Sequence, residues 1–155
     1  MKRRVTFAIV LSLGLVGSLL AADPFVGTYK LNLAKSKWPS SPPKESTIIV
    51  ASQGDDYLVT GTGTDAAGKP YSVNYTFPKK GRPVAYKEGG PPSGTSTTIK
   101  KTDDYTLDAT TTHDGKVIAT AHAVVSKDGK TSTRTVKGTD AQGNPVDSVE
   151  VYDRQ

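Results

Sequence analysis

The sequence predicts an all-β fold: an antiparallel up-and-down meander of about eight to ten strands, closed into a barrel. After residue 22 the chain shows no helical period, and turn-forming residues recur about every ten residues. Threonine is abundant throughout, which suits the pleated surface of a sheet. Ten strands are expected, over residues 25–33, 45–52, 57–63, 70–77, 83–87, 95–101, 105–112, 116–126, 131–138 and 145–152.

The first 22 residues have the pattern of an export signal. Residues 2–4 are basic, residues 5–20 are uncharged and rich in Leu and Val, and Ala21 and Ala22 are small residues before Asp23. An apolar run of this length rises only ~24 Å as a helix, less than the ~30 Å of a bilayer core. We therefore expect cleavage, export to the periplasm or the medium, no stable membrane span, and one domain over residues 23–155.

Cleavage also changes the charge of the chain. Removing residues 1–22 from the 155-residue chain leaves 133, and three of the 20 basic residues go with the signal, so the net charge of +5 falls to about +2. Lys79–Arg82 and Lys100–Lys101 are short basic clusters, which favour solvated turns over a nucleic-acid footprint. No nucleic-acid partner is expected. Cysteine is absent, so neither a disulfide nor a lipoprotein thiol can form.

An internal repeat fixes the pairing of two hairpins. Residues 49–77 align without a gap on residues 124–152, and Gly63–Pro70 recurs as Gly138–Pro145. Duplication and convergence on one turn solution explain this equally well. In each copy the loop reads as a type I turn followed by a left-handed glycine, which places Asp65 opposite Lys69, and Asp140 opposite Asn144 in the second copy.

Counting outward from these turns assigns side chains to faces. In the first copy one face carries Tyr57, Val59, Gly61, Gly63, Tyr71, Val73, Tyr75 and Phe77. In the second copy Arg134 lies opposite Glu150, on the face that carries Val136, Val146, Ser148 and Tyr152. Inside a barrel this charge pair would be a candidate site, because buried charges need each other or a ligand. On the outside it would be a surface ion pair worth ~1 kcal/mol or less.

An enzyme is not expected. The Asp114–Gly115 hairpin places His122 opposite Leu107, about 20 Å along the sheet from His113, so the two histidines cannot share a metal or a proton. The chain has no cysteine nucleophile, serine elbow or metal-spaced cluster. The sequence therefore predicts no catalytic residue, metal or cofactor.

The two ends of the mature chain resemble a known family. Phe25, Gly27, Tyr29, Leu31 and Leu33 alternate with mostly polar residues, and pairing of this first strand with the last would close the sheet. Phe25–Leu31 resembles the opening strand of lipocalins and fatty-acid-binding proteins, the calycin group, which carries Gly-x-Trp. Glu150–Arg154 looks like the closing strand of the fatty-acid-binding branch, whose Arg-x-Tyr grips a ligand carboxylate.

The resemblance departs from the family at diagnostic positions. Tyr29 replaces the Trp, and Glu150 replaces the carboxylate-binding Arg, so Arg134 on the neighbouring strand is the positive charge that could take its role. Ala34–Lys44 is short and rich in proline where that branch has a helix-turn-helix lid. The chain is most similar to an exported, bacterial, lipocalin-like protein.

This resemblance implies a function. A lipocalin-like barrel is expected to hold a small amphipathic or lipid-like molecule in its interior, with Arg134 and Glu150 as the polar anchor. The expected walls are Tyr29, Tyr75, Phe77 and Tyr152. The alternative is a non-enzymatic cell-envelope interaction module with a filled interior, acting through the loops at Trp38–Pro39 and Gly89–Pro92.

Overall fold

The computed structural model describes residues 23–78 and 80–155, in which eleven β-strands and one short 3-10 helix form. The predicted export signal lies outside the described residues. The 3-10 helix η1 spans Leu33–Lys35. The strands are β1 Gly27–Leu31, β2 Glu45–Gln53, β3 Asp56–Thr64, β4 Pro70–Pro78, β5 Lys80–Pro83, β6 Ala85–Glu88, β7 Thr95–Lys101, β8 Thr106–His113, β9 Lys116–Val125, β10 Thr131–Gly138 and β11 Ser148–Arg154.

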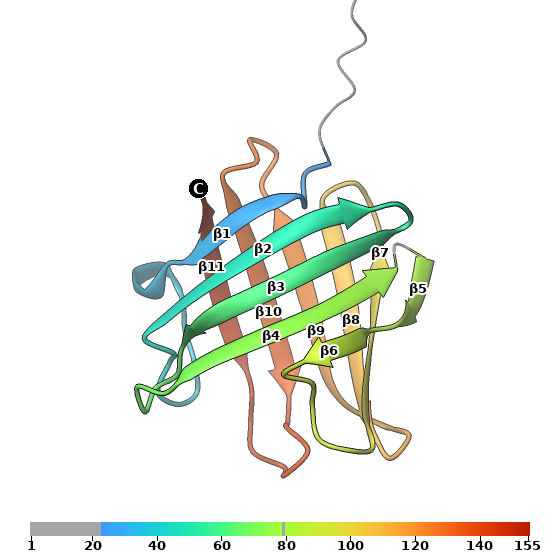
Figure 1. Cartoon of the computed structure of the whole chain (residues 1–155). Helices are drawn as coiled ribbons and strands as arrows, with labels where there is room; N and C mark the ends of the chain where they lie inside the picture. Colours follow the sequence, from blue (N-terminus) through green and yellow to red (C-terminus); the bar gives the residue numbers. More distant parts are fainter. Residues whose placement is uncertain (1–22, 79) are drawn as a thin grey trace, which may run out of the picture.

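All eleven strands belong to one antiparallel sheet that curls into a nearly closed barrel, as the sequence predicts. The spatial order is β5-β7-β8-β9-β10-β11-β1-β2-β3-β4-β6. Figure 1 shows β1 to β4 crossing in front of β8 to β11, so the two groups form opposite walls. The first and last strands pair, with Tyr29 opposite Arg154. The meander thus closes through its chain ends.

The prediction that this pairing removes the open edges is wrong. The two edges of the sheet are β5 and β6, which replace the single strand expected over 83–87. Pro83 of β5 pairs with β7 on one side, whereas Tyr86 of β6 pairs with Tyr75 of β4 on the other. The chain therefore passes from one wall of the barrel to the other at Val84. The edge strands β5 and β6 do not pair with each other, and we call this break in the sheet the seam.

The hairpin register predicted from the repeat is confirmed. Tyr57 pairs with Phe77 in the first copy, and Arg134 pairs with Glu150 in the second. Both turns make the same backbone hydrogen bonds: the amide of Asp65 donates to the carbonyl of Lys69, and that of Asp140 donates to Asn144 at the same distance, 2.9 Å. The two copies therefore fold alike around their turns.

Element ends differ from the prediction at both termini of the chain. Leu33 was expected on the inner face of the first strand, but it lies in η1 and is 43% exposed. The last strand begins at Ser148 rather than at residue 145, because the Asp147 side chain accepts a hydrogen bond from the Gly138 amide, 2.8 Å away. A side chain here replaces the backbone partner, so the ladder between β10 and β11 starts later than in the first copy.

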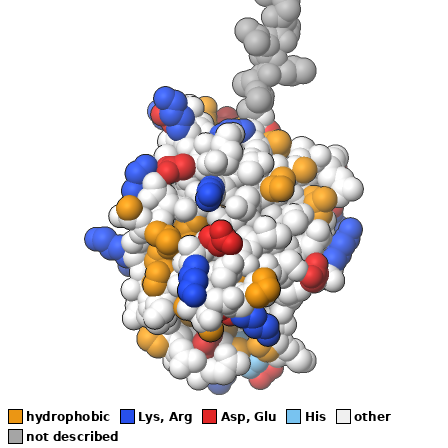
Figure 2. Space-filling view, turned by 60° about the vertical axis from the view of Figure 1, so that its left-hand side comes forward, with side chains coloured by type: hydrophobic (Ala, Val, Ile, Leu, Met, Phe, Trp, Pro, Cys, Tyr) orange, Lys and Arg blue, Asp and Glu red, His pale blue; other side chains and the backbone are white. Residues whose placement is uncertain are grey.

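The outer surface carries charges of both signs. Figure 2 shows lysine and arginine side chains interspersed with acidic and apolar ones on one face of the barrel. Surface ion pairs join the two signs, for example Lys35 with Asp153 at 3.2 Å. Over residues 23–78 and 80–155, no helix is long and apolar enough to cross a bilayer.

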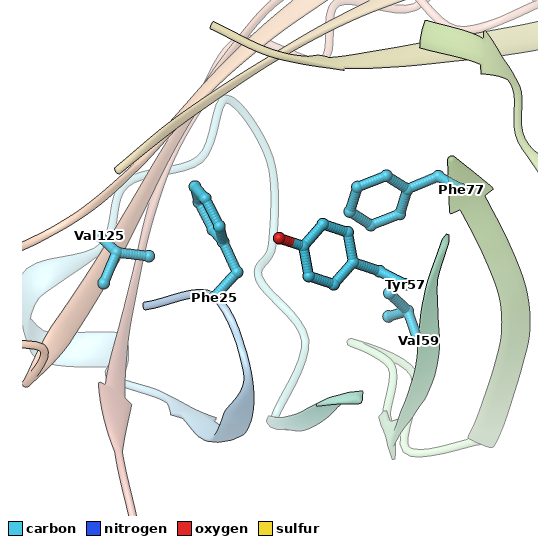
Figure 3. Packing of buried hydrophobic residues seen from close by; sticks show 5 residues of the cluster. All are labelled: Phe25, Tyr57, Val59, Phe77 and Val125. Atoms are coloured by element: carbon cyan, nitrogen blue, oxygen red, sulfur yellow. The ribbon is translucent and has the colours of Figure 1, made fainter. Parts of the chain in front are cut away.

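The largest buried cluster lies at one end of the barrel. Figure 3 shows the side chains of Tyr57, Val59 and Phe77 facing Phe25 and Val125 across the interior. The Tyr57 ring lies 5.0 Å from that of Phe77 and packs edge-on to that of Phe25. Phe25 precedes β1 and is 4% exposed, so the segment Asp23–Val26 enters the barrel as a plug.

We expect the fold to lose stability in acid through four surface aspartates. Hydrogen bonds to their carboxylates hold the pKa of each below its usual value; for Asp140 the main donor is the Asn144 side chain. A lowered folded-state pKa adds stability above about pH 4, and this contribution is lost as the pH falls through the folded value. The four residues are Asp103, Asp128, Asp140 and Asp153.

Urea unfolding at successive pH values between 6 and 2 measures this loss. The isosteric Asp140→Asn variant is expected to lose less stability than the wild type below pH 4, because its side chain no longer titrates. Parallel curves for the two proteins would show that the Asp140 turn contributes nothing to acid sensitivity.

Candidate functional site

Hydrogen bonds hold the plug in place and close one end of the barrel. The Tyr57 hydroxyl donates to the Asp23 carboxylate, and the Tyr29 hydroxyl donates to the Pro24 carbonyl at 2.8 Å. Arg154 donates to the carbonyls of Pro24 and Val26, with its guanidinium 5.6 Å from the centre of the Tyr29 ring. Burial and the bond to Asp23 raise the pKa of Tyr57, which stays a neutral donor. The plug is therefore part of the folded wall.

Arg134 and Glu150 lie on the inner face of the barrel. Their strand neighbours on the same face, Val136, Ser148 and Tyr152, are each 8% exposed, and alternate residues of a strand share a face. Arg134 Nη1 donates to Glu150 Oε2 at 3.3 Å, and the Ser148 hydroxyl donates to Glu150 Oε1 at 3.1 Å. The sequence left open whether this charge pair lies inside the barrel or on its outer surface. The structure places it inside.

The Arg134 side chain is accessible to water although it lies on the inner face. It is 49% exposed, whereas Glu150 is 14% exposed. Because an inward side chain in a filled barrel would be buried, this exposure means that water reaches the guanidinium within the walls. Burial tends to lower the pKa of Arg134, but Glu150 and the surrounding tyrosines raise it, so the group stays charged.

Tyrosine rings surround this pair from the opposite wall. Tyr75 of β4 and Tyr86 of β6 lie with ring centres 5.3 Å apart and tilted by 44°, and both act on the pKa of Arg134. Burial raises the pKa of the Tyr75 phenol, and the positive charge of Arg134 partly opposes this. Tyr86 is 36% exposed and lies at the seam. Two tyrosine side chains thus lie near the accessible guanidinium.

Tyr152 forms the third aromatic wall. Burial and the negative charge of Glu150 raise its pKa to about 12, so it is a neutral phenol near pH 7. Ser46 on β2 is its hydrogen-bond partner, and Tyr71 on β4 is close enough to affect its pKa. Ser46 is 5% exposed. The structure therefore adds Tyr86, Tyr71 and Ser46 to the predicted site.

Two of the six predicted site residues serve the plug end instead. Tyr29 is 4% exposed and is engaged by Pro24 and Arg154, and Phe77 is 3% exposed in the cluster with Tyr57. Both side chains fill the interior at the plug end rather than line the space around Arg134. The other four predicted residues, Tyr75, Arg134, Glu150 and Tyr152, come together around the accessible guanidinium.

The two histidines lie apart, but one predicted pairing is wrong. His122 faces Asp108, not Leu107, because a bulge between Thr111 and Thr112 shifts the register of β8 and β9 by one residue. His122 Nδ1 lies 2.6 Å from Asp108 Oδ1 on the outer face. Among the described residues no group of three or more histidine, cysteine or acidic side chains is arranged to hold a metal ion.

The loop after η1 contributes to a hollow at the surface. Trp38 packs partly buried against Tyr29, Leu31 and Tyr152. Beside it lies a hollow of about 340 Å³. Its lining comes from the loop and from the ends of β10 and β11: Lys37, Trp38, Pro39, Thr135, Val136, Lys137, Asp147, Ser148 and Val149. The indole is a wall of this hollow, and it is half enclosed rather than presented as a free surface patch.

No family model matches the chain, and a search of curated proteins finds no match either.

Proposed function

We propose that this protein is exported and binds a small amphipathic or hydrophobic molecule in the interior of its barrel. The observation that carries the proposal is the water-accessible Arg134, paired with Glu150 and bordered by Tyr75, Tyr86 and Tyr152. A ligand site of this kind combines apolar walls with a few polar groups that fix orientation. The barrel supplies both.

The energetics of the charge pair support a binding role. Desolvating an ion pair costs several kcal/mol per ion, and well-packed apolar residues in its place are often neutral or stabilising. A barrel that served only as a scaffold would gain by filling the space around Arg134 with such residues. The chain instead keeps a polar pair and the exposed Tyr86 ring there, which suits a molecule that enters and leaves.

The proposal includes a calycin-like relationship, in which the chain is a lipocalin-like member. The nearly closed antiparallel meander and the pairing of β1 with β11 support it. The export signal and its cleavage before Asp23 are part of the same proposal. A free chain start at this position would let the plug enter the barrel with only two residues before Phe25.

Mass spectrometry of protein exported by bacteria carrying the full chain tests the proposal. Under denaturing conditions we expect the mass of residues 23–155, and under native conditions a heavier species that carries a small molecule released by solvent extraction. Arg134→Met is expected to lose most of the bound molecule because the polar anchor is gone, whereas the surface variant Arg82→Met retains it. Native spectra without any added mass, together with no uptake of fluorescent lipid probes, would favour the filled interaction module.

A further inference from the structure

We infer that the head group of the ligand is uncharged and accepts hydrogen bonds, as an amide, ester or ketone does, and that the site discriminates against free carboxylates. This rests on the proposed function, because it names the chemistry that the interior of the barrel would select. It follows from the free donors of Arg134 and from the balance of charge around them.

The Arg134 guanidinium has more N–H donors than it uses in hydrogen bonds to the described residues. A guanidinium carries five N–H groups, and within the described chain the one hydrogen bond that Arg134 makes is to Glu150 Oε2. The Arg134 side chain is 49% exposed, so its other N–H groups can be hydrated. A buried donor that loses water on ligand binding must gain another acceptor, or about 1–3 kcal/mol is lost. The site therefore requires an acceptor on the ligand.

The positive charge of Arg134 is already balanced. Glu150 supplies the matching negative charge at 3.3 Å. Two other basic side chains near the interior are engaged elsewhere: Lys101 lies 3.6 Å from Asp104, and Arg154 donates to the carbonyls of Pro24, Val26 and Gly129 at the plug end. Among the described residues Arg134 is the one cation within salt-bridge distance of Glu150. A ligand carboxylate would thus bring a second negative charge to a guanidinium that is already paired.

Two like charges in an enclosed site disfavour each other's ionised forms. A carboxylate ligand would have to take up a proton, displace Glu150 from Arg134, or accept this repulsion. A neutral carbonyl accepts hydrogen bonds from the same N–H donors without taking up a proton, displacing Glu150 or adding a negative charge. The interior thus distinguishes the two head groups by charge alone.

The aromatic walls define the part of the ligand beyond the head group. The Tyr75 and Tyr86 rings border the guanidinium from the opposite wall, and Tyr86 is exposed at the seam. Among the described residues Tyr75 makes no hydrogen bond through its hydroxyl, which burial keeps neutral. A phenol of this kind can donate to the same carbonyl, while its ring contacts an apolar or planar body.

A matched pair of probes tests the inference: 11-(dansylamino)undecanoic acid and its primary amide, titrated by fluorescence at pH 7.5. Both carry the same fluorophore and chain, so a difference in affinity reports the head group. We expect the amide to bind the wild-type protein about tenfold more tightly than the acid, the effect of about 1.4 kcal/mol of charge repulsion. Tighter or equal binding of the acid would overturn the inference and leave the proposed function standing.

Glu150→Gln provides the reciprocal test. It removes the negative charge and leaves Arg134 unbalanced, so the acid should now bind as tightly as the amide or more tightly. The matched control is Glu45→Gln, the same change at an exposed carboxylate that accepts a hydrogen bond from Thr64, and it should keep the wild-type preference. An unchanged preference in a folded Glu150→Gln protein counts against the charge argument. Failure of the wild-type protein to take up either probe overturns the proposed function, and the inference with it.

Discussion

Replacing Gly138 with alanine is expected to lower the free energy of unfolding by about 3–5 kcal/mol. Gly138 ends β10 with φ +127°, a conformation that L-residues rarely adopt. A Cβ there would lie 2.1 Å from the Ile118 carbonyl oxygen and 2.7 Å from Ala119 Cα, both backbone atoms of β9. Since backbone cannot move aside as a side chain end can, the β9–β10 ladder would have to separate. Urea unfolding, followed by the fluorescence of the single tryptophan, measures the loss.

Alanine substitutions at two further glycines distinguish the cost of left-handed backbone strain from the cost of a steric collision. Gly143, in the adjacent turn, has φ +85° and open space where a Cβ would go, so its alanine variant should lose only about 1–2 kcal/mol. Gly63 is the repeat counterpart of Gly138, and its Cβ would lie 2.3 Å from the Glu45 carbonyl. Gly63→Ala therefore reports collision without left-handed strain, at about 1–3 kcal/mol. A Gly138 variant no less stable than the Gly143 variant would show that the close approach does not constrain β10.

The hairpins were predictable because their information is local. The turns Asp65–Lys69 and Asp140–Asn144 set the pairing of the strands beside them, and side-chain alternation then assigns faces. This was enough to place Tyr57 opposite Phe77, and Arg134 opposite Glu150. The candidate site was predictable for the same reason, since four of its residues lie on these two hairpins.

The seam and the register of β8 with β9 were not predictable from such patterns. The position of the seam depends on long-range packing between the two walls of the barrel. No short-range pattern in residues 79–88 indicates it. The bulge at Thr111–Thr112 lies in a run of threonines, where a one-residue shift changes no hydrophobic pattern. Tyr86 was missed as a site residue because its inward position depends on this seam.

Phe25 shows how a correct apolar pattern can be assigned to the wrong element. The alternation of Phe25, Gly27 and Tyr29 predicted a continuous strand, and Tyr29 does face inward from β1. Phe25 precedes the strand, however, and enters the end of the barrel with Asp23 and Pro24. Both arrangements bury the ring, so alternation could not choose between them.

The Phe25→Ala variant is expected to lower the free energy of unfolding by about 3–5 kcal/mol, the range for removing a buried phenylalanine ring. The ring is 4% exposed, packs edge-on against Tyr57 with centres 6.1 Å apart, and has the Lys101 ammonium 5.6 Å from its centre. Its removal leaves a cavity beside Val125 that the rigid sheet cannot collapse to fill. The plug should also detach more often, so amide hydrogen exchange at Val26 should quicken more than exchange in the hairpin of β10 and β11.

Leu33→Ala is the matched control, because Leu33 lies at the other end of β1 and is 43% exposed. Its loss should stay within about 0.5 kcal/mol, the usual range for a surface substitution. Phe25→Leu, which keeps a smaller apolar side chain in the same place, should recover part of the stability lost in Phe25→Ala. A Phe25→Ala protein as stable as the Leu33→Ala protein would mean that the ring does not close the barrel.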